Sequence, residues 1–498
     1  MGDSGMRSRS LTARRFAAIA SIATLGSLVA SACGGPSSPS TQIVSGLNRE
    51  GLAATDNRNI GAVPDTTAAI GPSYYVEAVN ARIAIFDAKT LKLVAARGPY
   101  PFWHLSPRSG AIEDPQIVWD YGAHRWYYSA LFTGVAGNRI LFAWTKGEDP
   151  SNLSSAWCRT SISSGNFIDD FPHLGFSRKH IVIATNVATR DHELVTGRLV
   201  VIGQPSSGPG VCARPPVKSF GSKASPLHRA DGHLAITLIP ADPVRPGDRA
   251  YVVSADCVYD PEPGKEEDPC GTRNRRGNQI TVWHVDGPRD SPRLSRDGGI
   301  DVQLYRLPSQ APQPRTKETL DTSDTRLYQA VSAPDPTRGV EEAIWTQHTV
   351  AGPDGRSVVR WYELDPRGLA VLRRGTIGSR SDWLFSAAIS PTVAGDRAVI
   401  HYVASGPDRL PELRARSRGP RTPDGVMSGE VTVARSIAPY RCGLGRKEPC
   451  PWGDYAAATP DLWRRGLVWG SNELMGSPEH RGPVGTYWRT QNFAIRPG

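Results

Sequence analysis

Residues Glu113 to Phe132 read Glu-Asp-Pro-Gln-Ile-Val-Trp-Asp-Tyr-Gly-Ala-His-Arg-Trp-Tyr-Tyr-Ser-Ala-Leu-Phe. The segments Pro115–Tyr121 and Arg125–Phe132 are rich in aromatic and β-branched residues, and a Gly-Ala-His turn joins them. The stretch therefore predicts a β-hairpin of one propeller blade. Its large aromatic residues are expected to pack between neighbouring blades; they are Trp119, Trp126 and Tyr128.

The pattern around this hairpin recurs along the chain. An aspartate beside proline, glycine or an aromatic residue is followed by short alternating strands and then by a Gly/Pro-rich loop. No window shows a sustained apolar period of about 3.6 residues. Repeats of about four short strands predict an all-β fold, a single β-propeller of seven blades with about four antiparallel strands each. The seven units begin near Asp65, Asp114, Asp170, Asp231, Asp324, Asp382 and Asp454.

The N-terminus has the features of an export signal. Arginines precede an apolar run over residues 16–32, which ends in Ala30-Ser31-Ala32-Cys33. A short run that ends in small residues indicates a secretory signal rather than a membrane span. Ordinary cleavage, a lipobox-like site that lipidates Cys33, and a twin-arginine signal are the alternatives. The predicted organisation is a signal over 1–33, a flexible tether and lead-in over 34–60, and the propeller over 61–498. We expect a lipoprotein facing outside the cell membrane, or a secreted protein.

The cysteines agree with export. There are seven, so lipidation of Cys33 leaves six for disulfides in an oxidising compartment. Six cysteines allow fifteen pairings, and nearness along the chain favours one of them. No cysteine belongs to a zinc-ligand motif. The favoured pairs are Cys158 with Cys212, Cys257 with Cys270, and Cys442 with Cys450.

The formal net charge is +10. Arginines gather over residues 273–276 and 414–421, in polar or Gly/Pro-rich surroundings that predict solvated loops. A basic surface attracts anionic headgroups or acidic glycans within about 8–10 Å. We expect no nucleic-acid partner, because the chain has no basic helical stripe and no reader motif.

Six short segments occur in order along the chain and together form a recognisable set. They are Pro64–Thr67, Glu113–Asp120, Asp169–Pro172, Leu320–Leu327, Arg360–Glu363 and Trp452–Tyr455. This set resembles a family of exported bacterial proteins expected to be sialidase-like β-propellers, whose members have no established reaction. The resemblance covers about residues 60–495 and implies the fold and the export. The chain departs from the family's pattern at Glu113, Phe171, His173 and Thr325.

The residues that open the units are the candidate ligand or metal site. If each aspartate begins the innermost strand of its blade, they surround one mouth of the central channel. Such carboxylates could hold Ca²⁺, and they would raise one another's pKa. Alternatively they accept backbone hydrogen bonds within turns, and Tyr455 packs between blades. The candidates are Asp65, Asp114, Asp170, Asp324, Arg326, Asp382, Asp454 and Tyr455.

Two functions follow from this surface. The first is a binding module for a polysaccharide or a protein partner at the cell envelope, with the membrane reached only through an N-terminal lipid. The alternative is a sialidase-like glycoside hydrolase or lyase, with Tyr455 and Glu473 as nucleophile and base. The chain has no Ser-x-Asp-x-Gly-x-Thr-Trp box. An enzyme would show carboxylates about 5–10 Å apart beside an open pocket with arginines, whereas a binder would show aspartates tied into turns.

Overall fold

The computed structural model describes residues 40–56, 63–80, 82–135, 137–191, 193–206, 212–258, 276–443, 448–476 and 487–498. These residues belong to one compact unit, Pro39–Gly498. The predicted signal, the lipidation site Cys33 and the cysteine Cys270 lie outside the described residues.

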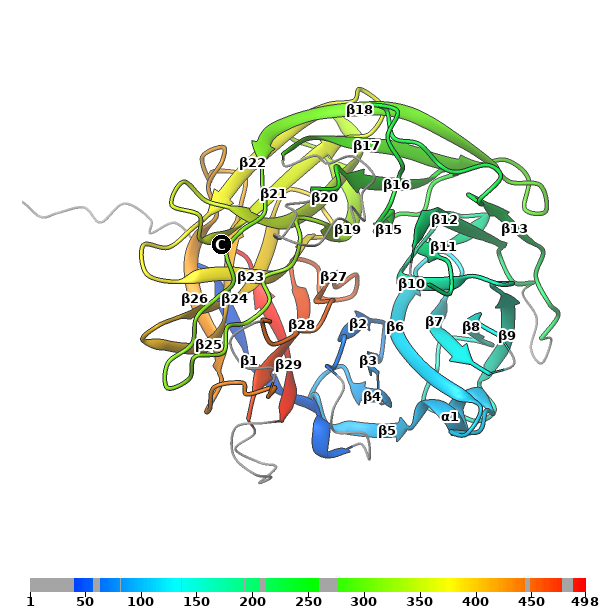
Figure 1. The fold of residues 1–498 in the computed structure, drawn as a ribbon, viewed down its shortest axis with the longest axis horizontal. Coiled ribbons are helices and arrows are strands. Elements are labelled where there is room, and N and C mark those ends of the chain that lie inside the picture. Colours follow the sequence, from blue (N-terminus) through cyan, green and yellow to red (C-terminus); the bar gives the residue numbers. More distant parts are fainter. Residues whose placement is uncertain are drawn as a thin grey trace, which may run out of the picture. The chain divides into compact units, whose positions relative to one another are not determined.

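Seven antiparallel sheets surround a central channel (Figure 1), so the predicted seven-bladed β-propeller is confirmed. Blade 1 holds β2 (Thr67–Ile70), β3 (Tyr74–Val79), β4 (Arg82–Asp87) and β5 (Leu93–Arg97). Blade 2 holds β6 (Gly110–Asp120), β7 (Arg125–Gly134), β8 (Arg139–Thr145) and β9 (Trp157–Ser163). Blade 3 holds β10 (Ile168–Phe176), β11 (His180–Ala188), β12 (Leu194–Gly203) and β13 (Val217–Phe220). Blade 4 holds β14 (Ile239–Pro240), β16 (Ala250–Ala255), β17 (Gly277–Asp286) and β18 (Arg293–Tyr305).

The remaining blades follow the same order from the channel outwards. Blade 5 holds β19 (Leu327–Asp335), β20 (Val340–Ala351), β21 (Ser357–Asp365) and β22 (Ala370–Ile377), and β15 (Asp242–Pro243) adds to it in parallel. Blade 6 holds β23 (Trp383–Pro391), β24 (Ala398–Gly406), β25 (Arg409–Arg418) and β26 (Ser428–Arg435). Blade 7 holds β27 (Ala457–Pro460), β28 (Val468–Met475), β29 (Trp488–Arg496) and β1 (Gln42–Ala53). The short helices are η1 (Ala54–Asp56) and α1 (Pro99–Trp103).

The ring is closed by the two ends of the described chain. Strand β1 pairs antiparallel with β29, so the first strand completes the last blade (Figure 1). This pairing gives blade 7 four strands, with β1 as its outermost strand. Strand β1 lies within residues 34–60, which the sequence assigned to the tether and lead-in, so the ring begins before residue 61.

The hairpin that predicted the fold packs as expected. Strands β6 and β7 form it, and Trp119 pairs with Trp126 across the two strands. Trp119, Trp126 and Tyr128 share a buried cluster with Val76 and Ile83 of blade 1. Each blade has two apolar faces, and stacking against both neighbours buries them.

Two of the predicted disulfides are present, Cys158–Cys212 and Cys442–Cys450. Cys257 is also disulfide-bonded, and its predicted partner, Cys270, lies outside the described residues. Disulfides of this kind indicate an oxidising compartment. Within the described ranges, no helix has the length and apolar character needed to span a bilayer.

The prediction of solvated loops is wrong for the arginines of residues 414–418. Arg414, Arg416 and Arg418 lie in β25, and Arg414 and Arg418 are buried. They alternate with Leu413 and Ala415, which belong to the buried core. These three arginines therefore lie on one face of strand β25 and not in a solvated loop.

Candidate ligand site at the channel mouth

Bulges in the innermost strands position the acidic residues at the mouth. The pairing of β6 with β7 shifts between Glu113 and Gln116, and that of β10 with β11 shifts between Asp170 and His173. The first unpaired residue of each bulge has a left-handed backbone conformation. This residue is Asp114 in β6, with a φ of 56°, and Phe171 in β10, with a φ of 52°. When the two strands are matched by their bulges, Asp170 corresponds to Glu113, since each directly precedes a bulge. The position of Asp114 is occupied by Phe171 in β10.

The deepest acid of the mouth is Asp65, which is buried. Its Oδ2 accepts a hydrogen bond from Asn80 Nδ2 at 2.6 Å, and its Oδ1 accepts one from the backbone N–H of Asp454 at 2.7 Å. Asn80 Oδ1 in turn accepts a hydrogen bond from the backbone N–H of Asp114 at 2.7 Å. These bonds join the inner edges of blades 1, 2 and 7.

Among the described residues, Arg326 supplies the guanidinium that interacts with these acids. Its Nε and Nη2 donate to Asp324 at 2.6 and 2.5 Å, which is a bidentate pair. The guanidinium also lies 4.3 Å from the ring centre of Phe171. Asp321 also belongs to the mouth, because its charge acts on Asp454.

Burial, together with the charges of neighbouring acids, raises the pKa values of three acids at the mouth. Burial, followed by the charge of Asp454, raises the pKa of Asp65 to about 7. Burial, followed by the charges of Asp65 and Asp170, raises the pKa of Asp114 well above its usual range. Burial raises the pKa of Asp454 to about 6, although Arg326 opposes this shift. The mouth is therefore a region of negative potential that one arginine does not neutralise.

A pocket of about 500 Å³ opens beside these acids, between blades 3, 4 and 5. Asp170 and Asp324 are solvent-exposed on its wall, and half of the side-chain surface of Asp324 is accessible. Apolar side chains form much of the remaining wall, including Leu194, Val258 and Leu307. Asp256 also lines the pocket, but its charge is matched by the buried Arg229, 3.2 Å away. The size is that of an ordinary small-ligand site.

Aromatic residues fill the channel beneath the mouth. Tyr455 of blade 7 stacks on Phe171 of blade 3, with ring centres 5.1 Å apart, and His173 touches both rings. Blades 3 and 7 are not neighbours, so these rings meet across the channel. A cavity of about 40 Å³ remains beside Gln116, His173 and Tyr455, which is room for ordered water.

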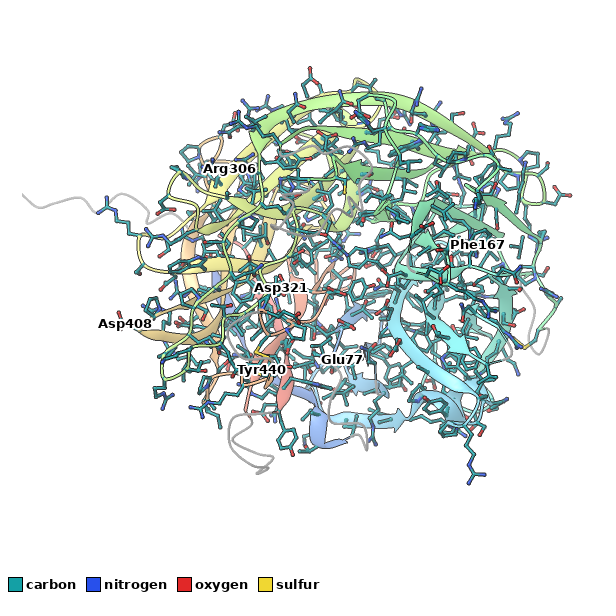
Figure 2. The ribbon with its side chains drawn as sticks, viewed as in Figure 1. Glu77, Phe167, Arg306, Asp321, Asp408 and Tyr440 are labelled. Carbon is teal, nitrogen blue, oxygen red and sulfur yellow. A yellow bond between two sulfur atoms is a disulfide. The ribbon has the colours of Figure 1, made fainter. Side chains whose placement is uncertain are left out.

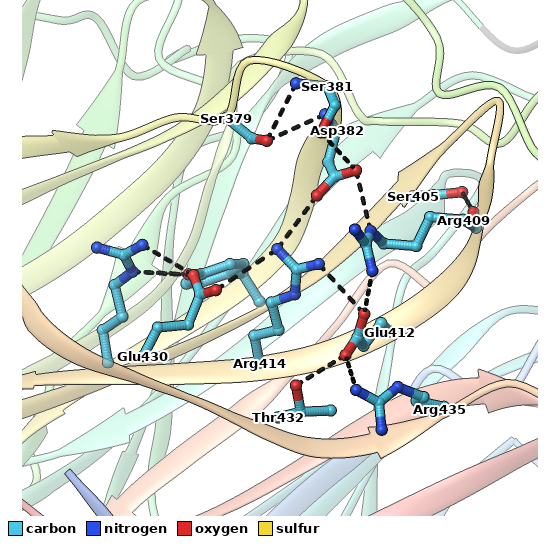
Figure 3. Close-up of polar contacts among 12 residues, drawn as sticks. Ser379, Ser381, Asp382, Ser405, Arg409, Glu412, Arg414, Glu430, Thr432 and Arg435 are labelled. Carbon is cyan, nitrogen blue, oxygen red and sulfur yellow. Dashed lines mark hydrogen bonds and ion pairs between the residues drawn. The ribbon is translucent and has the colours of Figure 1, made fainter.

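Two of the unit-opening aspartates lie elsewhere. Asp382 is bound by Arg409 Nε at 3.1 Å and Arg414 Nη1 at 3.2 Å, on blade 6 (Figure 3). Asp231 pairs with Arg229 at 2.7 Å in the connection before β14. The structure thus brings together Asp65, Asp114, Asp170, Asp324, Arg326, Asp454 and Tyr455.

Sequence reasoning missed Asn80 and Asp321, which contribute to the same mouth. Asp321 lies in the quoted segment Leu320–Leu327, and its charge raises the pKa of Asp454. Asn80 follows β3 directly, and a polar residue at a strand end carried no distinctive signal.

The mouth does not have the close spacing of a calcium site. Ligands of one Ca²⁺ ion lie about 2.3–2.6 Å from the ion, so their oxygens lie close together. In the described part of the chain, the one group with three potential ligand atoms within 4.8 Å is Glu318, Cys442 and Cys450. Both cysteines of that group are in a disulfide, so their thiolates cannot bind a metal.

The geometry does not favour the sialidase mechanism. Burial and the charge of Asp114 raise the pKa of Tyr455, which disfavours a phenolate nucleophile. Glu473 Oε2 accepts a hydrogen bond from the backbone N–H of Gly453 at 2.8 Å, so it serves the backbone beside the mouth. A substrate carboxylate bound to Arg326 would lie next to the acids around this arginine, and their charges would repel it.

The chain has remote likenesses to solved structures. No family model and no curated protein matches the chain. The Dos1 propeller is 12% identical with a TM-score of 0.39, covering 90% of this chain and 96% of that one. A Trypanosoma rangeli sialidase is 9% identical with a TM-score of 0.36, covering 92% and 60%. A quinohemoprotein alcohol dehydrogenase from Comamonas testosteroni is 10% identical with a TM-score of 0.37, covering 90% and 78%.

Proposed function

We propose that this protein is an exported, lipid-anchored binding module that recognises a hydroxyl- or amine-bearing glycan at the channel mouth. The observation that carries the proposal is the pocket of about 500 Å³ in which the exposed Asp170 and Asp324 stand beside apolar walls. The disulfides Cys158–Cys212 and Cys442–Cys450 support export. Lipidation at Cys33 and a place at the cell envelope remain part of the proposal.

The chemistry of the pocket selects the kind of glycan. Carboxylates accept hydrogen bonds from sugar hydroxyls, and they attract amino groups. Apolar walls such as Leu194 and Leu307 suit the C–H faces of a sugar ring. Anionic sugars are disfavoured because the acids at the mouth outnumber Arg326. A cationic side chain of a protein partner has complementary charge too, and the test below separates the two.

The test is a glycan array probed with the full-length protein and with the variant Asp170→Asn. The Asp170 side chain is exposed and forms no hydrogen bond with a described residue, so the substitution should leave the fold intact. Loss of a charge-assisted hydrogen bond corresponds to about tenfold or more in affinity. We expect neutral or amino glycans to bind the wild type and to bind Asp170→Asn at least about tenfold more weakly.

The matched control is Asp408→Asn, which removes an exposed carboxylate from the β24–β25 turn of blade 6 (Figure 2). It should bind like the wild type. Loss of binding in the presence of a chelator would indicate that a cation such as Ca²⁺ bridges the glycan to the acids. Absence of glycan binding by the wild type would reject the glycan and leave a protein partner. Equal binding by Asp170→Asn would place the site elsewhere.

Hydrolysis of a neutral glycoside is the second candidate function. The pKa of Asp454 is raised to about 6, in the range that suits a general acid near neutral pH. Asp454 is solvent-accessible at the mouth and lies among other carboxylates. New reducing ends released from the bound glycan, and lost in Asp454→Asn, would establish the enzyme. Intact glycan after long incubation would leave the binding module.

A further inference from the structure

A second hollow, of about 520 Å³, lies between the outer strand of blade 4 and the sheet of blade 5. Three arginines line it: Arg276 directly before β17, Arg306 directly after β18, and Arg360 in β21. None of the described residues that line this hollow is acidic. Arg306 lies near β22 in the ribbon view (Figure 2), and Thr376 of β22 lines the same hollow.

Arg360 is held rigidly without a counter-charge. It is 6% exposed, and its Nη1 donates to the backbone carbonyls of Gln303 and Leu304 at 2.8 and 3.1 Å. Its Nε is buried without a hydrogen-bond partner among the described residues. Burial and the charge of Arg360 lower the pKa of the neighbouring His348 to about 3, so this histidine is neutral. A buried guanidinium whose hydrogen-bond acceptors among the described residues are neutral carbonyls is costly unless an anion joins it.

Arg276 and Arg306 add charge that the described residues do not neutralise. Both are exposed, and neither forms an ion pair with any described residue. The half-buried Arg356 of the same region differs, since its Nε and Nη2 both donate to Asp354 Oδ2. The hollow therefore concentrates positive charge that the carboxylates of the described residues leave uncompensated.

The hollow lies on the same face of the propeller as the acidic mouth. The turn between β20 and β21 lines it, and this turn is fixed by the bonds Ala351 N–H to Arg306 O and Ser309 N–H to Gly355 O, both 2.9 Å. Arg306 lines this hollow, whereas the next residue, Leu307, lines the pocket at the mouth. One stretch of chain thus separates the two sites.

We propose that this hollow is a second ligand site, which binds an oxyanionic group such as sulfate, phosphate or carboxylate. Guanidinium groups match the planar or tetrahedral oxygens of such anions with paired hydrogen bonds. The hollow has the volume of a small-molecule site and exceeds what one tetrahedral ion needs, so an anionic substituent on a saccharide fits it best. This site does not depend on the glycan site at the mouth.

The test is isothermal titration calorimetry of the full-length protein at constant ionic strength. The probes are inorganic sulfate, dextran sulfate and unsubstituted dextran. We expect saturable binding of the sulfated probes to the wild type and none of dextran. The double variant Arg276→Gln with Arg306→Gln should weaken this binding at least about tenfold, because charge-assisted hydrogen bonds are lost. Arg360→Lys, which keeps the charge but loses the fork, should weaken it as well.

The control variant is Arg380→Gln, which removes an exposed arginine from the connection after β22. Arg380→Gln and Asp170→Asn should both bind the sulfated probes like the wild type. Saturable binding of sulfate but not of dextran sulfate would identify a free ion as the ligand. No saturable binding to the wild type would overturn the proposal. So would unchanged binding by the double variant, or an equal loss in Arg380→Gln, which would reveal general attraction to the net charge.

Discussion

The channel mouth and the charged network of blade 6 both contain many acids, but they differ in how those acids are compensated. At the mouth, the carboxylates of Asp65, Asp114 and Asp454 face one another, with Arg326 as the cation among them. On blade 6, acids and arginines alternate in a continuous network (Figure 3). That network comprises Asp382, Arg409, Glu412, Arg414, Arg416, Glu430 and Arg435.

The pKa values move in opposite directions in the two regions. Burial would raise the pKa of Glu412, but the hydrogen bond from Thr432 and the charge of Arg414 bring it below its usual value. Burial and the charge of Asp454 raise the pKa of Asp65 to about 7, and among the described residues the main contacts that oppose this shift are hydrogen bonds and not a cation. The network satisfies its own charges and stabilises the blade, whereas the mouth keeps charge that a ligand can satisfy. This difference is why the ligand is proposed at the mouth and not at Asp382.

The largest effect is expected for Glu412→Gln in the network. Glu412 Oε2 accepts from Arg409 at 3.1 Å and from Arg414 at 3.2 Å, and Oε1 accepts from Arg435 at 2.9 Å and from Thr432 at 2.7 Å. Removing one partner of a buried ion pair costs about 3–5 kcal/mol. Arg414 keeps Asp382 as a partner, so we expect a loss of about 3 kcal/mol in the free energy of unfolding, measured by urea denaturation.

The matched control is Glu341→Gln, which removes an exposed ion pair with Arg367. It should change the unfolding free energy by less than about 0.5 kcal/mol. If Glu412→Gln cost no more than this control, the network would not stabilise the blade and the contrast with the mouth would fail.

A smaller effect is expected at the mouth, and it depends on pH. The pKa of Asp65 is about 7 in the folded chain against an ordinary value of 3.8. A raised pKa means that the folded state binds the proton more tightly. Its stabilising contribution is therefore complete below about pH 4 and is lost as the pH rises through 7. Between pH 5 and pH 8, the wild type should lose about 2–3 kcal/mol through this group.

Asp65→Asn isolates this contribution. Residue 65 has a φ of 49°, and asparagine tolerates this left-handed conformation. Urea denaturation at pH 5 and pH 8 should show a smaller loss of stability in Asp65→Asn than in the wild type. Equal losses in both proteins would mean that the pKa of Asp65 is not raised in the folded chain.

The sequence allowed the repeat to be predicted because each blade carries its own alternating strands. The role of β1 could not be predicted, because its partner β29 lies at the other end of the chain and its own pattern is largely polar. Likewise, the sequence aligns Asp114 with Asp170, but the bulges shift Asp170 by one position. Such register shifts arise when two strands pair, so the sequence of one strand alone does not predict them.

The mouth and the network were also not equally predictable. Acids at the start of inner strands converge because a propeller brings those ends together, which the repeat implies. Asp382 follows the same pattern, but its carboxylate bonds to Arg409 and Arg414 of β25. The signal was present in the alternation of Arg414 and Arg416 with Leu413 and Ala415, which is typical of a strand with one charged face.

The smallest effect is expected for Arg435→Gln, which tests whether burial or the number of ion pairs stabilises the network. Arg435 and Arg414 both bind Glu412, but the side chain of Arg435 is 69% exposed and that of Arg414 is 11% exposed. Solvent screens the pair of Arg435, so its loss should cost at most about 0.5 kcal/mol, and less in high salt. Arg414→Gln should cost several times more, because it leaves the buried Glu412 and Asp382 with fewer partners. Equal losses of unfolding free energy in the two variants, measured by urea denaturation, would mean that the number of ion pairs stabilises the network and that their burial does not. The network and the mouth would then differ only in the balance of their charges.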